Sequence, residues 1–202
     1  MNNPLSRTLP LKLIWENFVT AETESRRIIL HKRRKESNLH VILKVLAYCY
    51  FWEKKLIIEP RYTLNRYRPD LIAWGRSEIP TKEEWIPSMW IECKHVKIKK
   101  LIKLSRAFPF SNIVWFHLMR PLAKVLEGIQ SKQYLFSNVQ LIGIKTLDKN
   151  WDSLKESINL KQPQWGIIKH KNNLMVINRR ERERDPVNLE FYILPATIKT
   201  QI

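Results

Sequence analysis

The chain has 202 residues, of which 44% are hydrophobic, and it carries 36 lysines and arginines against 19 aspartates and glutamates. The hydrophobic content excludes wholesale disorder, and the length suits one substantial core rather than two. A net charge of +17 costs self-repulsion and is typical of proteins with a polyanionic partner, most commonly nucleic acid. The alternative is a basic surface without a specific ligand, but the clustering of the charges favours a polyanion.

Cysteine usage and hydropathy indicate a cellular compartment. The two cysteines, Cys49 and Cys93, each lie in an apolar segment, which argues against a secreted disulfide framework and against a cysteine-based zinc site. The N-terminal residues lack the apolar segment of a signal peptide. The apolar run 45–52 is too short to cross a bilayer. We therefore expect a cytoplasmic protein with no membrane partner.

The hydrophobic pattern predicts alternating strands and helices along the chain. In chain order we expect strands over 11–19 and 27–31, a helix over 37–54 capped by Ser37 or Asn38, strands over 56–58, 67–74 and 89–95, a helix over 97–107, a strand over 113–118, a helix face over 122–129, a strand over 139–144, a short helix over 151–158, a hairpin over 165–177 and a strand over 189–194. The strand over 113–118 is apolar on both faces, so it should be central and parallel to its successor.

This order of elements predicts the fold class. A helix, three strands, a helix and a further strand form an α/β core with one central mixed β-sheet flanked by helices. The core should span about 36–145, with an N-terminal strand pair and a C-terminal β-hairpin region over about 160–195 added to it. We expect residues 1–202 to form a single domain, with residues 75–87 as an exposed excursion.

Two short motifs in the predicted sheet carry the candidate chemistry: Pro69-Asp70, and Glu92-Cys93-Lys94. Side chains alternate along a strand, so Glu92 and Lys94 should point the same way, roughly 7 Å apart. If the two strands pair, Asp70 should lie beside Glu92 and Lys94. Two carboxylates and an ammonium can hold a divalent cation and a water beside a phosphodiester. The alternative is a surface ion pair on an edge strand, which the apolar Trp90 and Ile91 argue against.

These motifs resemble those of the PD-(D/E)XK nuclease superfamily, which has a restriction-endonuclease-like core. Its aspartate lies on the second core strand and its Glu-x-Lys on the third, matching Asp70, Glu92 and Lys94. Glu36, at the start of the preceding helix, matches an acidic residue that many members carry. The resemblance implies a metal-dependent endonuclease that hydrolyses DNA and leaves a 5′-phosphate.

The expected roles follow from ligand chemistry. Asp70, Glu92 and the Cys93 carbonyl offer hard oxygen ligands suited to Mg²⁺ or Mn²⁺. Glu36 would bind the metal through water or hold a second ion. Lys94 would orient the attacking water and offset charge on the phosphoryl oxygens.

Most of the chain is also similar to the YaeQ-like proteins. The shared features include a Glu-led helix ending Leu46-Ala47-Tyr48, a third strand reading Trp90-Ile91-Glu92, and a hairpin with Asn172-Asn173-Leu174. YaeQ-like proteins tend to lack a lysine two residues after that glutamate, whereas this chain has Lys94. The lysine favours an enzyme. The relatives without it keep a second function open: a catalytically inactive nucleic-acid-binding or regulatory protein with a nuclease fold.

Basic clusters surround the motifs and predict a nucleic-acid surface. Tyr62 and Tyr67 lie among these charges. A mixture of basic side chains and aromatic rings suits single strands or distorted duplexes, whose bases can stack on the rings. Either a monomer or a homodimer is compatible with the sequence, and DNA is the expected partner. The predicted contacts are Arg33, Arg34, Lys35, Arg66, Arg68, Lys97, Lys99, Lys100, Lys103 and Arg106.

Overall fold

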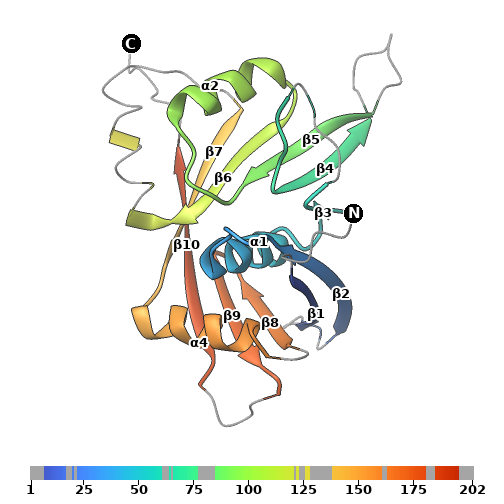
Figure 1. The fold of residues 1–202 in the computed structure, drawn as a ribbon, viewed down its shortest axis with the longest axis vertical. Helices are drawn as coiled ribbons and strands as arrows, with labels where there is room; N and C mark the ends of the chain where they lie inside the picture. The colour runs from blue at the N-terminus through green and yellow to red at the C-terminus, as the bar shows by residue number, and fades with distance from the viewer. Residues whose placement is uncertain are drawn as a thin grey trace. The chain divides into compact units, whose positions relative to one another are not determined.

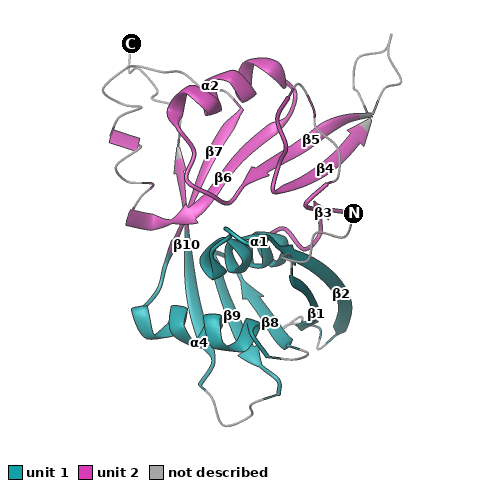
Figure 2. Ribbon diagram, in the orientation of Figure 1, with its two compact units in different colours: residues 1–50, 145–191 teal, residues 51–144, 192–202 magenta. Residues whose placement is uncertain are grey.

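The protein has a mixed α/β fold (Figure 1). The computed structural model describes residues 7–16, 20, 22–60, 64, 66–76, 85–120, 122, 126–127, 138–160, 163–180 and 185–195. The chain divides into two compact units (Figure 2). Unit 1 comprises Met1–Tyr50 and Lys145–Phe191, and unit 2 comprises Phe51–Ile144 and Tyr192–Ile202.

Unit 1 contains a sheet with the strand order β2-β1-β8-β9-β10. Its elements are β1 (Arg7–Glu16), β2 (Thr23–Lys32), α1 (Asn38–Tyr50), α4 (Asp148–Ile158), β8 (Gln164–His170), β9 (Asn173–Asn178) and the start of β10 (Val187–Pro195). The predicted N-terminal strand pair is confirmed, because β1 and β2 pair antiparallel. The predicted hairpin is confirmed in β8 and β9. The parallel pairing of β1 with β8 joins these two motifs into one sheet.

Both helices of unit 1 cover the same face of this sheet. On β1 alternate residues are buried, and on β8 the buried run includes Trp165 and Ile167. From α1, the ring of Tyr50 contacts that of Phe191 on β10, with centroids 4.7 Å apart. From α4, Ser157 accepts a hydrogen bond of 3.1 Å from the indole of Trp165 on β8. The hydroxyl of Ser37 accepts the backbone N–H of His40 at 3.2 Å, which confirms Ser37 as the cap of α1.

Unit 2 contains a sheet with the strand order β7-β6-β5-β4-β3. Its elements are β3 (Ile57–Ile58), β4 (Leu71–Arg76), β5 (Trp85–Glu92), α2 (Ile98–Ala107), β6 (Asn112–Leu118) and β7 (Val139–Lys145). β4 pairs antiparallel with β5, whereas β5, β6 and β7 are parallel. The predicted central strand is therefore confirmed as β6. The predicted helix face over 122–129 lies largely outside the described residues. Of the predicted excursion over 75–87, residues 75–76 and 85–87 instead lengthen the paired strands β4 and β5, and the remaining residues lie outside the described ones.

Helix α2 connects β5 to β6 and packs on one face of this sheet. Its buried Leu101 and Leu104 join a hydrophobic core that includes Ile72, Trp90 and Trp115 from three neighbouring strands. Side chains at alternate positions of a strand share a face. The even-numbered positions at this end of β4 and β5 therefore face α2, which places Asp70 and Glu92 on the α2 side.

Several predicted strand boundaries are wrong, and two of them matter for the site. The strand expected over 89–95 ends at Glu92, so Lys94 lies beyond it. The strand expected over 67–74 begins at Leu71. Tyr67 instead exchanges backbone hydrogen bonds of 2.8 Å with Leu64, which closes a local turn. None of the described helices is long and apolar enough to cross a membrane.

Candidate functional site

Asp70 and Glu92 lie side by side where β4 begins and β5 ends. The two strands are antiparallel with Leu71 opposite Ile91, and the N–H of Asp70 donates to the carbonyl of Ile91 at 3.0 Å. Asp70 is 7% exposed and Glu92 is fully buried. Burial raises the pKa of Glu92, and the neighbouring charge of Asp70 raises it further. The two carboxylates are therefore close enough to repel each other.

The protein holds at least one oxygen of each carboxylate. The backbone N–H of Cys93 donates to Oδ2 of Asp70 at 2.8 Å. The indole N–H of Trp90 and the ammonium of Lys100 donate to Oε1 of Glu92 at 3.0 and 2.7 Å. These hydrogen bonds oppose the rise in the pKa of Glu92. They also fix the direction in which the second oxygen of each carboxylate points.

Lys94 lies beside those second oxygens. Its ammonium is 4.0 Å from Oδ1 of Asp70 and 3.9 Å from Oε2 of Glu92. The Lys94 side chain is 49% exposed, so the group reaches solvent. The backbone carbonyl of Lys94 accepts a hydrogen bond of 2.9 Å from the indole of Trp115 on β6. Asp70, Glu92 and Lys94 thus converge as the sequence predicts, although Lys94 reaches the others from beyond the strand.

Lys100 occupies a position that the sequence analysis missed. The basic cluster that follows the motif predicts Lys100 to be a nucleic-acid contact. Instead its ammonium contacts buried Glu92, and its side chain is 25% exposed. Two features of the sequence could have predicted this ion pair. Glu92, if buried, needs a counter-charge, and Lys100 lies in the first turn of the helix that follows the motif.

A metal ion at this place would have two carboxylates available. The buried Oε2 of Glu92 has no hydrogen-bond partner among the described residues, and a buried oxygen of this kind normally has one. Within the described part of the chain, no third His, Cys, Asp or Glu side chain completes a metal-binding cluster. Further ligands would therefore come from backbone carbonyls, such as that of Cys93, and from water.

Glu36 belongs to unit 1, where its carboxylate is already well coordinated by protein groups. Oε1 lies 2.7 Å from Nδ1 of His40 and 2.6 Å from the ammonium of Lys44, which is 1% exposed. Oε2 accepts the backbone N–H of Arg33 at 3.1 Å. Burial alone would raise the pKa of Glu36, but these hydrogen bonds outweigh it and lower the pKa to about 2. The structure thus gives Glu36 a role in stabilising the start of α1, and its metal-binding role stays a prediction.

The predicted nucleic-acid contacts fall on both units. Arg33, Arg34 and Lys35 are exposed before α1 in unit 1. The remaining residues belong to unit 2, where Arg68 is half-buried and donates to the carbonyl of Glu59 at 3.4 Å. Of the predicted contacts in unit 2, the exposed ones are Arg66, Lys97, Lys99, Lys103 and Arg106. Tyr62 lies outside the described residues.

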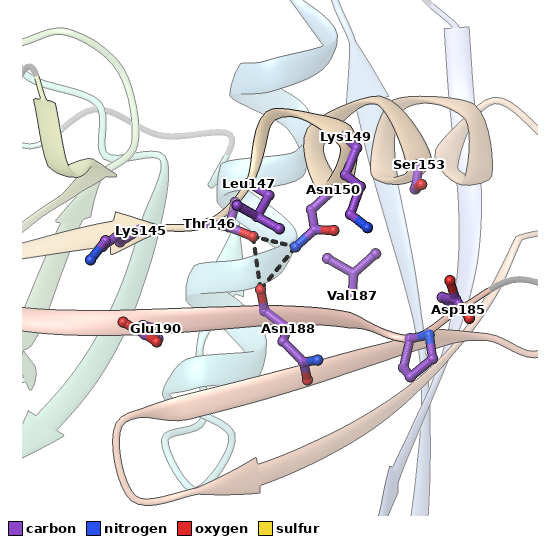
Figure 3. A pocket seen from close by; sticks show the side chains of 11 residues that line it. Lys145, Thr146, Leu147, Lys149, Asn150, Ser153, Asp185, Val187, Asn188 and Glu190 are labelled. Carbon is purple, nitrogen blue, oxygen red and sulfur yellow. Dashed lines mark hydrogen bonds between the residues drawn. The ribbon is translucent and has the colours of Figure 1, made fainter.

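Unit 1 also has a cavity of about 830 Å³ between the start of α4 and β10 (Figure 3). Its central polar groups bond to one another: Thr146 and Asn150 both donate to the carbonyl of Asn188, at 2.7 and 3.2 Å. Two lysines on its wall are matched by Asp185 and Glu190. Because charges of both signs line the cavity, its charge favours neither an anionic nor a cationic ligand.

Comparison with solved structures identifies the fold. The YaeQ protein from Xanthomonas axonopodis pv. citri superposes with a TM-score of 0.66 at 13% sequence identity, over 92% of this chain and 96% of that one. The YaeQ protein from Pseudomonas syringae gives a TM-score of 0.65 at 16% identity, over 94% and 96%. No protein-family model and no curated protein matches the sequence. The chain therefore shares the fold of the YaeQ proteins, and its chemistry must be argued from its own residues.

Proposed function

We propose that this protein is a metal-dependent endonuclease that hydrolyses phosphodiester bonds in DNA, with a PD-(D/E)XK type of active site in unit 2. The observation that carries the proposal is the convergence of Asp70, Glu92 and Lys94 where β4 begins and β5 ends. The net charge of +17 supports a polyanionic substrate. The restriction-endonuclease-like core predicted from the sequence is part of the same proposal.

The residues present fit a divalent cation. Glu92 is buried, and its Oε2 has no hydrogen-bond partner in the described chain. Asp70 and Glu92, with the carbonyl of Cys93, would hold Mg²⁺ or Mn²⁺ through hard oxygen atoms. When bound, such an ion polarises the phosphate and lowers the pKa of its water.

The chain's own residues would position the reacting groups. The exposed ammonium of Lys94, beside both carboxylates, can orient the attacking water and offset the negative charge that develops on the phosphoryl oxygens. The Cys93 N–H and the Trp115 indole fix the segment that carries Lys94. Trp90 and Lys100 hold Oε1 of Glu92 and so keep its carboxylate in one orientation. Supporting contacts of this kind typically change metal affinity or activity by about 10- to 100-fold when removed.

One observation favours a second candidate function, a non-catalytic nucleic-acid-binding or regulatory protein. The 2.7 Å ion pair between Lys100 and Glu92 neutralises the buried carboxylate without a metal. In this alternative the cluster only stabilises the end of β5, and the basic surface alone binds nucleic acid.

A cleavage assay separates the two candidates. Wild-type protein, Asp70→Asn and Lys94→Ala are incubated with supercoiled, linear, branched and single-stranded DNA, and with RNA, in Mg²⁺, Mn²⁺ or EDTA. Lys155→Ala is the matched control, because Lys155 is 44% exposed and also ion-paired, on α4. The endonuclease requires cleavage by wild type and the control with metal only, and none by Asp70→Asn. Intact nucleic acids under every condition would leave the binding protein as the function.

A further inference from the structure

Helix α2 presents an unbroken basic stripe to solvent. Lys99, Lys103 and Arg106 are all exposed, and spacings of four and three residues place them on one side of a helix. The stripe covers about 10 Å at 1.5 Å per residue. The first turn of α2 has no acidic residue, and none occurs between Ile98 and Ala107. The buried Leu101 and Leu104 face away from the stripe, toward the core.

An exposed aromatic ring follows this stripe. Phe110 is 68% exposed, the highest value among the described large hydrophobic residues that lie on the surface. Its neighbour Phe108 turns inward and stacks on Trp90, with ring centroids 4.9 Å apart. The turn therefore holds one phenylalanine in the core and the other in solvent.

The turn that carries Phe110 is held in place by several hydrogen bonds. The side-chain amide of Asn138 donates to the carbonyls of Phe108 and Ser111 at 2.8 and 3.0 Å. The hydroxyl of Ser111 donates to the carbonyl of Pro87, and its N–H donates to the carbonyl of Phe108 at 3.1 Å. The backbone that carries the ring is therefore already ordered, so that binding need not order this turn.

We propose that the α2 stripe and Phe110 together bind single-stranded nucleic acid. Lys99, Lys103 and Arg106 would contact successive phosphates, and an unpaired base would stack on Phe110. The inference rests on the proposed function in taking nucleic acid as the partner, and it narrows the substrate to single-stranded segments. It does not require cleavage.

Charge and local order distinguish Phe110 from other exposed apolar residues. Single exposed apolar side chains are common on protein surfaces. Leu147 is 62% exposed, but acidic and basic residues surround it, including Asp185 and Glu190. Only basic charges precede Phe110 along α2, which favours a polyanion over an apolar protein surface.

Fluorescence anisotropy in EDTA tests the proposal without interference from cleavage. The probes are a labelled oligothymidylate, an oligouridylate and a fully paired DNA hairpin. Phe110→Ala should weaken binding of both single strands by about 5- to 100-fold, with little effect on the hairpin. Phe110→Trp should retain affinity, and Phe110→Leu, which keeps the apolar surface without the ring, should not. Leu147→Ala is the matched control and should bind like wild type.

Several outcomes would overturn the proposal. They are an unchanged single-strand affinity in Phe110→Ala, an equal loss for the hairpin, or retention of affinity by Phe110→Leu, which would indicate an apolar protein partner. Cleavage by a Phe110→Ala variant with normal single-strand binding would reject this surface while the endonuclease stands. If the wild type cleaves no substrate but its single-strand binding depends on the Phe110 ring, the endonuclease is rejected and this binding surface stands.

Discussion

The ammonium of Lys100 lies 2.7 Å from the carboxylate of Glu92, a side chain with no solvent exposure. A buried carboxylate without a counter-charge is costly, so this pair lets the site keep its negative group when no other cation is present. Helix α2 and strand β5 are thereby joined electrostatically as well as through their apolar contacts. The same helix carries the exposed stripe proposed for nucleic acid, so one element would serve both parts of the function.

Replacement of Lys100 by Met should destabilise the protein. The change leaves Glu92 buried without its closest positive partner, at a cost of about 3 kcal/mol in the free energy of unfolding. Urea titration measures the loss. Lys99→Met, on the exposed side of α2, is the control and should change stability by less than about 0.5 kcal/mol. The double change Lys100→Met with Glu92→Gln should recover most of the loss, and a double variant as unstable as the single one would contradict the ion-pair explanation.

Lys94→Ala should lower the rate of DNA cleavage by roughly 10² to 10³, the usual cost of losing one transition-state charge stabiliser. Metal binding should be largely retained, because both carboxylates remain. Single-turnover kinetics measure the first quantity and calorimetric titration with Mn²⁺ measures the second. A variant that loses metal binding and cleavage together would show that Lys94 supports the structure of the site rather than the reaction.

Because of Glu36, the free energy of unfolding should change with pH in the acid range. Hydrogen bonds from His40 and Lys44 outweigh the effect of burial and lower the pKa of Glu36 from an ordinary 4.5 to about 2. A lowered pKa contributes stability above the unfolded value, and that contribution is lost as the pH falls from about 5 to about 2. At pH 7 Glu36→Gln should therefore be less stable than wild type, by about 1–3 kcal/mol because solvent partly screens the carboxylate. The difference in stability between wild type and Glu36→Gln should narrow in that acid range. A difference that does not change with pH would contradict the assigned role of the Glu36 carboxylate.

Removal of the exposed lysines of α2 should flatten the salt dependence of duplex binding. Each phosphate contact contributes about −0.9 to the slope of log K against log salt concentration. Lys99→Ala combined with Lys103→Ala should therefore reduce the magnitude of the slope by up to about 1.8. Lys155→Ala, whose ammonium pairs with Asp152 at 2.8 Å, should leave it unchanged. Equal slopes in all three proteins would place the phosphate contacts elsewhere.

Most of the elements could be predicted from the sequence because each has a strong local pattern. The strand over 112–118 is apolar on both faces, and the structure places it between two parallel neighbours. Helix α1 begins after Ser37, whose side chain caps it as expected. These features depend on a few adjacent residues, which is why periodicity and capping rules succeed with them.

The contacts that join distant segments could not be predicted in the same way. No local pattern shows that β1 pairs with β8, because register between strands depends on the whole sheet. The end of β5 was placed too late, because the apolar residues continue to Cys93 while its N–H turns to Asp70. The sequence predicts Lys100 on the basic surface because it belongs to a cluster of lysines, and a cluster does not show how far one ammonium reaches toward a buried carboxylate.

The pairing of β1 with β8 also bears on how the chain is made. Arg7 on β1 donates to the carbonyl of Asn159, 152 residues later, and β1 reaches its parallel neighbour only through Gln164 and beyond. At ribosomal rates the second strand emerges on the order of ten seconds after the first. During that interval the β1–β2 hairpin has an open hydrogen-bonding edge, which can pair with another nascent chain. A holdase chaperone that covers this edge during synthesis should therefore raise the soluble yield.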